Sequence, residues 1–321
     1  MKKEQKKGSI DLSRLRRISL KQRKNLVKVE DFAHPVEPSA PFARIIDSLP
    51  QILAGEEFRS LVEAIVISRR NERGVVAALG AHVVKCGLSP IIIDLMERGI
   101  LTAVAVHGAT AIHDFEIASL GRTSEDVVQG LKEGTYGMVE ETARAFAGAA
   151  EEGSKGKGLG RALGELILQT KSPYAKYSIL AAASRLDLPA TVHVALGTDT
   201  IHMHPEISGA QMGEASLIDF HKIASVVCEL ERGVWLNIGS AVILPEVFLK
   251  AVAIARNLGH QLQGLTTANL DFIQHYRPRM NVIERPTKAS GVPGRGIALT
   301  GHHEIMLPLL RLAILARVEK K

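Results

Sequence analysis

Short apolar runs alternate with longer amphipathic stretches from Gly74 to the end of the chain. Six of these runs are rich in β-branched residues and stop at glycine or polar positions, which is typical of buried strands. Between them, apolar residues recur at the spacing of one helical face. We expect strands at 75–79, 102–106, 190–196, 234–238, 265–270 and 297–300. We expect helices at about 42–49, 56–70, 87–98, 111–120, 138–152, 158–169, 173–186, 217–231, 245–257 and 303–317.

The repeated order of strand and helix predicts an α/β fold with a doubly wound, mostly parallel, Rossmann-like sheet of six strands. We assign residues 41–321 to this domain. The segment between the second and third strands is mostly helical in pattern. We therefore predict a helical insertion at about 123–186, with the glycine- and lysine-rich stretch 153–160 as a flexible joint.

The composition supports a large core built from small aliphatic side chains. Hydrophobic residues make up 46% of the 321 residues and aromatic residues only 4%, as suits parallel strands covered on both faces. No apolar run reaches the length of a membrane span. The two cysteines, Cys86 and Cys228, lie in apolar helical patterns. We expect both to be small buried hydrophobes in a reducing, cytoplasmic compartment.

The net charge of +6 is distributed unevenly along the chain. Residues 1–28 contain eleven Lys or Arg and two acidic residues, a balance of +9, which leaves −3 for the rest. We therefore treat residues 1–40 as a basic N-terminal arm ahead of a mildly acidic body. A solvated arm is the simpler interpretation, and an arm that contacts an acidic partner is the other.

In open α/β sheets, ligands bind beyond the carboxyl ends of the strands. The turns expected there are rich in small residues, which let backbone N–H groups approach a phosphate. Tight strand-to-helix turns also need glycine for conformational reasons, but several such turns at one edge favour a nucleotide. The candidate cofactor-binding residues in these turns and in the fifth strand are Gly80, Ala81, His82, Gly108, Ala109, Thr110, Gly197, Thr198, Asp199, Gly239, Ser240, Thr267, Ala268 and Thr300.

Seven of the twelve histidines fall in or just after these turns. Since histidine titrates near neutral pH and both donates and accepts hydrogen bonds, this rim suits acid–base chemistry. His202 and His204 have the look of a metal pair, but no further ligand follows at zinc spacing, and we assign no metal ligand. Phosphate-loop, nucleophile-elbow and Gly-x-Gly-x-x-Gly signatures are missing from the sequence. The seven histidines are His82, His107, His113, His202, His204, His302 and His303.

Several segments resemble the deoxyhypusine synthase family, especially its bacterial-like members. The most specific part is Ala-Ile-His-Asp-Phe-Glu-Ile-Ala at 111–118, followed by Leu-Gly-Arg-Thr-Ser-Glu-Asp at 120–126. Ile-Gly-Ser-Ala-Val at 238–242 and Leu-Pro-Leu-Leu at 307–310 extend the resemblance. It covers roughly residues 60–317. It adds His113 and Asp114 to the candidate cofactor-binding residues.

The resemblance implies NAD as cofactor and a homotetramer with sites at subunit interfaces. Members of the family oxidise spermidine with NAD and hold the aminobutyl group on a lysine as an imine, before passing it to another amine. Lys288 lies near the offset expected for that lysine, and His221 follows Gly213-Glu214 much as a family histidine follows its Gly-Asp. The resemblance thus implies a catalytic set of Lys288, His221 and Asp199.

The sequence also departs from the family in places. The segment 283–288 lacks the family's tryptophan, and Thr300-Gly301 replaces an aspartate-alanine pair. We expect an NAD-dependent enzyme that transfers an aminoalkyl group from a polyamine or similar small amine. Two alternatives stay open: an NAD-using enzyme that applies the histidine rim to another substrate, and a non-catalytic homo-oligomer that binds a nucleotide.

Overall fold

The protein is described by a computed structural model that covers residues 15–19, 21–288 and 294–318. Its six strands form one sheet in the order β3-β2-β1-β4-β5-β6, and every neighbouring pair is parallel. The expected doubly wound, six-stranded α/β fold is therefore confirmed. The strands are β1 (Val75–Leu79), β2 (Ala103–His107), β3 (Ala190–His193), β4 (Val234–Ile238), β5 (Thr266–Asp271) and β6 (Arg295–Thr300).

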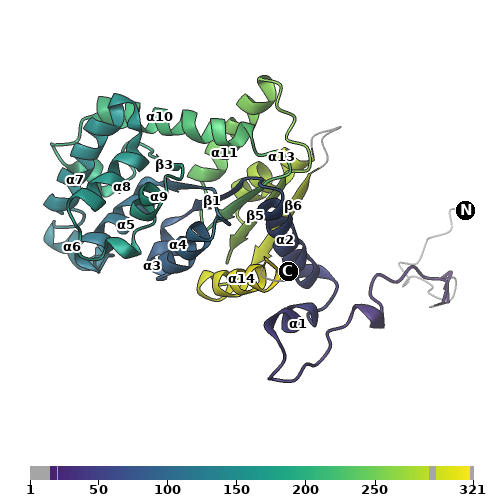
Figure 1. Cartoon of the computed structure of the whole chain (residues 1–321). Helices are drawn as coiled ribbons and strands as arrows, with labels where there is room; N and C mark the ends of the chain where they lie inside the picture. Colours follow the sequence, from purple (N-terminus) through teal and green to yellow (C-terminus); the bar gives the residue numbers. More distant parts are fainter. Residues whose placement is uncertain (1–14, 20, 289–293, 319–321) are drawn as a thin grey trace, which may run out of the picture.

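Helices separate the strands along the chain and cover the sheet (Figure 1). Four of them, α3, α6, α12 and α13, were not expected, because segments of three to seven residues are too short to show a helical period. The helices are α1 (Phe42–Asp47), α2 (Leu53–Arg70), α3 (Ala81–Lys85), α4 (Ser89–Glu97), α5 (Gly108–Leu120), α6 (Val127–Glu133), α7 (Glu140–Glu152), α8 (Leu159–Gln169), α9 (Ile179–Arg185), α10 (Gly209–Cys228), α11 (Ile243–Asn257), α12 (Tyr276–Pro278), α13 (Arg285–Thr287) and α14 (His303–Val318).

The sheet separates two cores, because successive strand side chains point to opposite faces. In β1, Val75 and Leu79 pack with apolar side chains of α2, α4 and α14, while Val76 packs with side chains of α10 and α11. On this second face Trp235, from β4, stacks on Phe248 with ring centroids 4.3 Å apart. Buried small and branched residues thus fill both faces, as the composition indicated.

The strand order reverses between β1 and β4, which makes this pair the topological switch point of the sheet. The helix after β1 packs into the first core through Val83, whereas the helix after β4 packs into the second through Leu244. The carboxyl ends of these strands stay linked: the N–H of Gly80 donates to the carbonyl of Ile238, 2.8 Å away. Because all strands are parallel, every strand-end turn lies on one edge, as predicted.

The stretch 153–160, expected as a flexible joint, forms a kinked connection between α7 and α8. Residues Gly153–Lys157 follow α7 directly, Gly156 lies outside helical geometry with φ 109°, and α8 begins at Leu159. The buried carboxylate of Asp219 fixes this junction by accepting hydrogen bonds from the backbone N–H groups of Gly160 and Val192, both at 2.8 Å. A Cβ at Gly158 would lie 1.9 Å from Oδ1 of Asp219, so only glycine fits.

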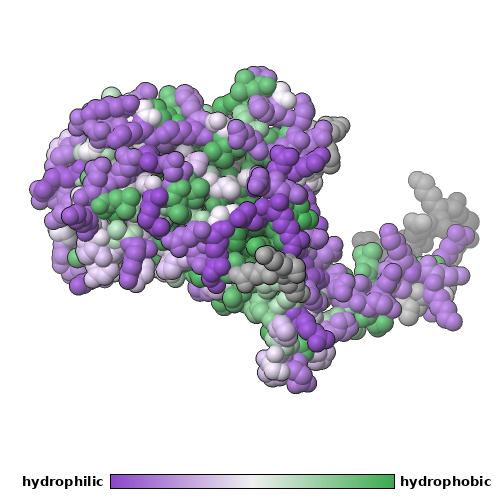
Figure 2. Space-filling view, in the orientation of Figure 1, coloured by the Kyte–Doolittle hydropathy of each residue, from purple (hydrophilic) through white to green (hydrophobic). Residues whose placement is uncertain are grey.

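The described part of the N-terminal arm extends away from the α/β body as far as α1 (Figure 1). Backbone hydrogen bonds from Gln51 to Asp31 and from His34 to Ser48 tie its end to the start of the helical region. Figure 2 shows hydrophilic side chains over most of the visible face of the body, with small hydrophobic patches between them. None of the helices in the described ranges is long and apolar enough to cross a membrane.

The packing of the switch point predicts opposite effects for two glycine-to-alanine changes. A Cβ at Gly80 would lie 2.0 Å from the carbonyl oxygen of Gly239, so Gly80→Ala should lower the free energy of unfolding by about 3 kcal/mol. Gly148 lies in α7 with open space around its Cβ position, so Gly148→Ala should raise it by up to about 1 kcal/mol. Urea denaturation measures both. Equal stability of the two variants would contradict the close approach of the β1 and β4 turns.

Candidate functional site

The turns after β1 and β4 form the centre of the candidate site. Neither turn has room for a larger residue: Gly80 is closed by the backbone of Gly239, and Gly239 itself has φ 68°, in the left-handed region. Ser240 is buried and its hydroxyl accepts a hydrogen bond from the N–H of Leu244 in the first turn of α11. Ala81 is half-buried in the first turn of α3. The structure therefore brings four of the predicted residues together here, Gly80, Ala81, Gly239 and Ser240.

A ring cluster borders these turns on the side of β5 and β6. His303, at the start of α14, is 1% exposed, and its ring lies against the Gly239 turn. Its Nε2 lies 3.0 Å from the carbonyl oxygen of Leu270, which can only accept, so in the neutral ring Nε2 carries the proton. Nδ1 then has a free lone pair, is buried and has no hydrogen-bond partner. The rings of His82 and Phe272 lie 5.9 and 6.4 Å from that of His303.

Asp199 occupies the amino end of α5, where a phosphate was expected. Its carboxylate accepts a hydrogen bond from the N–H of Ala109, and a Cβ at Gly108 would lie 1.9 Å from its Oδ2. Burial raises the pKa of Asp199 to about 6, and Oδ2 has no partner. Thr110 is buried, and its hydroxyl donates to the carbonyl of Leu79, the last residue of β1, at 3.0 Å.

Two neighbouring histidines at the ends of β2 and β3 are held neutral. His107 and His193 are register partners across these strands. Burial lowers the pKa of His107 to about 4, with a smaller effect from His113, and burial lowers the pKa of His193 to about 3. Of the two, only His107 belonged to the predicted histidine rim. Neither group carries a charge at neutral pH.

Asp114 and His113, from the motif that carries the resemblance, point into the insertion. The carboxylate of Asp114 accepts from the N–H groups of Ile179 and Leu180 and from the hydroxyl of Ser178, which caps the start of α9. Burial raises the pKa of Asp114 to about 6, against the lowering effect of these hydrogen bonds. His113 contacts the hydroxyl of Thr123 at 2.5 Å. Both side chains thus have partners within the chain itself.

The loop after β3 holds its polar groups in local hydrogen bonds. Nδ1 of His202 accepts from the backbone N–H groups of Gly197 and Asp199, both at 3.2 Å. The hydroxyl of Thr198 donates to the carbonyl of Ala195, and Nε2 of His204 lies 2.8 Å from the carbonyl of Gly137. His202 and His204 therefore bind separate backbone groups, and neither joins a metal-ligand group among the described residues.

The remaining cofactor candidates lie in the two strands beyond β4. Thr267 and Ala268 are fully buried near the start of β5, which separates them from the carboxyl edge. Thr300 is exposed at the end of β6 and lies on that edge. The structure thus brings Thr300 toward the predicted site and leaves the β5 pair inside the sheet.

The proposed catalytic lysine lies at the other edge of the sheet. Lys288 follows α13, and a Cβ at Gly294 would lie 3.2 Å from Cα of the adjacent Thr287. The N–H of Arg295, the first residue of β6, donates to Leu265, just before β5. This region is therefore the amino edge, a strand length of about 20 Å from the carboxyl ends. Lys288 is exposed and donates to Glu284 at 3.2 Å.

His221 lies on α10, the helix between β3 and β4. Its side chain is exposed, and its ring lies 6.1 Å from that of Phe220. The three residues of the expected catalytic set, Lys288, His221 and Asp199, are thus not assembled within one chain. The offset from the closing motif does not by itself give the edge, but the predicted parallel sheet does: Lys288 precedes the sixth strand, and residues before a parallel strand lie at the amino edge.

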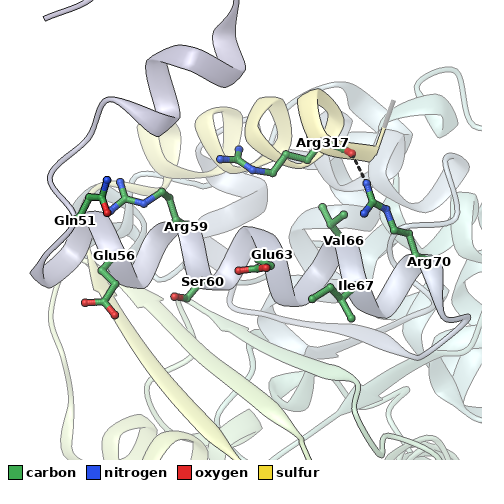
Figure 3. Close-up of a pocket in the computed structure, with 9 residues that line it drawn as sticks. All are labelled: Gln51, Glu56, Arg59, Ser60, Glu63, Val66, Ile67, Arg70 and Arg317. Atoms are coloured by element: carbon green, nitrogen blue, oxygen red, sulfur yellow. Dashed lines mark hydrogen bonds between the residues drawn. The ribbon is translucent and has the colours of Figure 1, made fainter. Parts of the chain in front are cut away.

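A groove of about 590 Å³ runs along α2 and lies apart from the strand-end turns (Figure 3). Two of its arginines are engaged within the chain: Arg59 donates to the carbonyls of Leu49 and Pro50, and Arg70 to that of Arg317. Figure 3 shows Arg70 at one end of the groove, Gln51 and Arg59 at the other, and the side chain of Arg317 between them. The groove contains none of the predicted site residues.

Sequence reasoning left out several residues that the structure places at the carboxyl edge. His303 was noted in the histidine rim but not assigned a role, and Phe272, Cys86 and Glu304 were not assigned to the site. Cys86 is half-buried rather than buried as expected, and so is Cys228. The available signal for this part of the site was the run of three consecutive ionisable residues at the start of α14, His302, His303 and Glu304.

Comparison with known proteins identifies the fold but no family. No family model matches the sequence, and no curated protein matches it. Among solved structures, a putative deoxyhypusine synthase from Entamoeba histolytica matches with a TM-score of 0.52 and 9% identity, over 89% of this chain and 97% of its own. This likeness supports the shared α/β fold that the sequence resemblance implied.

A second likeness is to a much longer protein. Unliganded AgrE matches with a TM-score of 0.51 and 13% identity, over 87% of this chain and 33% of its own. AgrE in ternary complex with ornithine and NAD+ gives a TM-score of 0.49 at 13% identity, over 87% of this chain and 34% of its own. The chain thus spans about a third of AgrE, and at these identities the likeness is one of fold.

The position of Asp114 predicts a structural role that can be separated from cofactor binding. Asp114→Ala would leave three donors at the start of α9 unsatisfied in a buried setting, at a cost of about 3 kcal/mol in the free energy of unfolding. Asp126 is an exposed cap of α6, so Asp126→Ala should cost only about 1 kcal/mol. Thermal and urea denaturation measure both. A folded Asp114→Ala protein of normal stability would show that the cap is unimportant.

Proposed function

We propose that the chain is an NAD-dependent enzyme that oxidises a small amine, with the cofactor bound at the carboxyl ends of β1 and β4. The observation that carries the proposal is the switch point itself. The chain leaves Gly80 toward one face of the sheet and Gly239 toward the other, and open α/β sheets bind their ligands in the crevice this creates. The sequence resemblance to deoxyhypusine synthases supports NAD as the nucleotide.

The position of Asp199 constrains how the cofactor would lie. Its carboxylate already faces the amino end of α5, where it would repel a phosphate group. The cofactor phosphates would then lie toward the Ala81 and Ser240 turns. Asp199 would remain free to attract the ammonium group of the substrate through its unpartnered Oδ2. Such an ion pair would lower the pKa of the carboxyl toward its usual range.

The proposed reaction is removal of a hydride from the carbon that bears the amine. A bound NAD+ would supply the hydride acceptor, and the amine nitrogen would lose a proton as the substrate becomes an imine. His303 is the group best placed to take that proton, because its Nδ1 has a free lone pair and lies against the Gly239 turn. Transfer of an aminoalkyl group would need a lysine at this edge, and Lys288 of the same chain lies at the other.

The resemblance also motivates a homotetramer with sites at subunit interfaces. In such an assembly the carboxyl edge of one subunit would be completed by side chains of another. Loss of turnover in Lys288→Ala would then support a lysine supplied across an interface and aminoalkyl transfer. Unchanged turnover would limit the reaction to hydride removal.

Cofactor binding is tested by adding a negative charge beside the proposed phosphate position. Ala81→Glu places a carboxylate in the first turn of α3, where it is compatible with the helix but repels the cofactor phosphates. We expect the Kd for NAD in calorimetry to rise at least about tenfold. Ala54→Glu adds the same charge to the first turn of α2 and should leave the Kd unchanged. Equal Kd values for both variants would show that the cofactor binds at another position, and no measurable binding to the wild type would show that NAD is not the cofactor.

The reaction is tested by the absorbance of reduced NAD in the presence of 1,4-diaminobutane, spermidine or ornithine, with 1,4-butanediol as the control that lacks an amine. His303→Gln keeps a donor for the carbonyl of Leu270 but removes the free ring nitrogen. We expect kcat to fall at least about 100-fold with NAD binding retained. NAD binding without turnover of any amine in the wild type would favour the non-catalytic nucleotide-binding alternative.

A further inference from the structure

A histidine, a cysteine and a glutamate converge beside the switch point. His82 lies in the first turn of α3, Cys86 caps the end of the same helix, and Glu304 lies in the first turn of α14. Their ligand atoms all lie within 4.8 Å of one another. Sγ of Cys86 is 3.8 Å from Oε2 of Glu304. Residues four apart share one helix face, so α3 presents His82 and Cys86 together toward α14.

Cys86 and Glu304 are already in contact. The thiol of Cys86 donates a hydrogen bond to Oε2 of Glu304. A divalent ion between the two groups would take the place of that proton, since metal ligation deprotonates a coordinating thiol.

We propose that His82, Cys86 and Glu304 bind a zinc ion. Imidazole nitrogen, thiolate sulfur and carboxylate oxygen form a mixed donor set that suits zinc. Calcium and magnesium bind through oxygen ligands, so this donor set argues against them. Zinc ligands lie at about 2.0 to 2.3 Å from the ion, so the three donor atoms would draw together by roughly an ångström. His82 and Glu304 are exposed side chains and have room to rotate into place.

Three protein ligands leave a fourth position at the zinc, as in catalytic sites. Nδ1 of His302 lies 3.7 Å from the other oxygen of Glu304, Oε1, and its ring stacks on Phe272 with centroids 6.4 Å apart. This arrangement orients the carboxylate from the outside, in the manner of a group that supports a metal ligand. The ion would join α3 to α14 at the wall of the crevice, next to His303.

The site is tested with the full chain and no nucleotide, so its outcome is independent of the proposed function. Protein dialysed against a chelator is titrated with zinc in competition with a chromophoric chelator. We expect one ion per chain, with Cys86→Ala weakening binding at least about 100-fold. Cys228→Ala removes the other free cysteine, which is similarly half-buried at the end of α10, and should bind zinc as the wild type does.

Cobalt substitution supplies a readout of the ligands themselves. Cobalt(II) bound at this site should show a thiolate charge-transfer band that Cys86→Ala abolishes and Cys228→Ala keeps. Glu304→Gln should weaken zinc binding while the far-ultraviolet circular dichroism stays that of the wild type. The proposal is overturned if the wild type binds no stoichiometric zinc, or if Cys86→Ala binds it as tightly.

Discussion

The close approach of two backbone turns, at Gly80 and Gly239, is the constraint on which the carboxyl edge of the sheet depends. The carbonyl of Gly239 fills the space where Gly80 would carry a side chain, so β1 and β4 end at the same level. The chain then departs to opposite faces of the sheet. His303, at the start of α14, packs against Gly239 and donates a hydrogen bond to the carbonyl of Leu270 near the end of β5. The start of α14 is thereby held at the same edge of the sheet. The candidate site is a consequence of this packing.

Three aspartates, two buried and one half-buried, organise the other half of the molecule. Asp114, Asp199 and Asp219 each accept hydrogen bonds from backbone N–H groups at the start of a helix: α9, α5 and α8 respectively. In every case the aspartate is distant in sequence from the helix it caps, so it joins elements as well as satisfying donors. Burial raises the pKa of all three, to about 6, 6 and 7. The protein thereby fills with its own carboxylates the helix ends that would otherwise attract anions.

The sequence predicted the positions of the strands and the type of fold more accurately than it predicted which residues form the candidate site. Strands β1 and β4 occur at the predicted residues, because a run buried on both faces is apolar throughout and ends sharply at glycine. Helix α3 escaped notice because five residues cannot display a helical period. Lys288 was assigned from its offset along the chain, although its position before the sixth parallel strand already implied the amino edge of the sheet. Asp114 shows a different difficulty: its motif is recognisable, but only the structure shows that its partners belong to α9.

Trp235 gives this architecture a built-in optical reporter. It is the only tryptophan in the sequence, and it lies fully buried in β4 between the sheet and Phe248. An indole in so apolar a setting emits at short wavelength, and solvent exposure on unfolding would shift that emission to the red. Reduced nicotinamide absorbs in the range of tryptophan emission, so a cofactor at the end of the same strand would quench the indole by resonance energy transfer. The intrinsic fluorescence of one residue would therefore follow both the packing of the second core and the binding of the proposed cofactor.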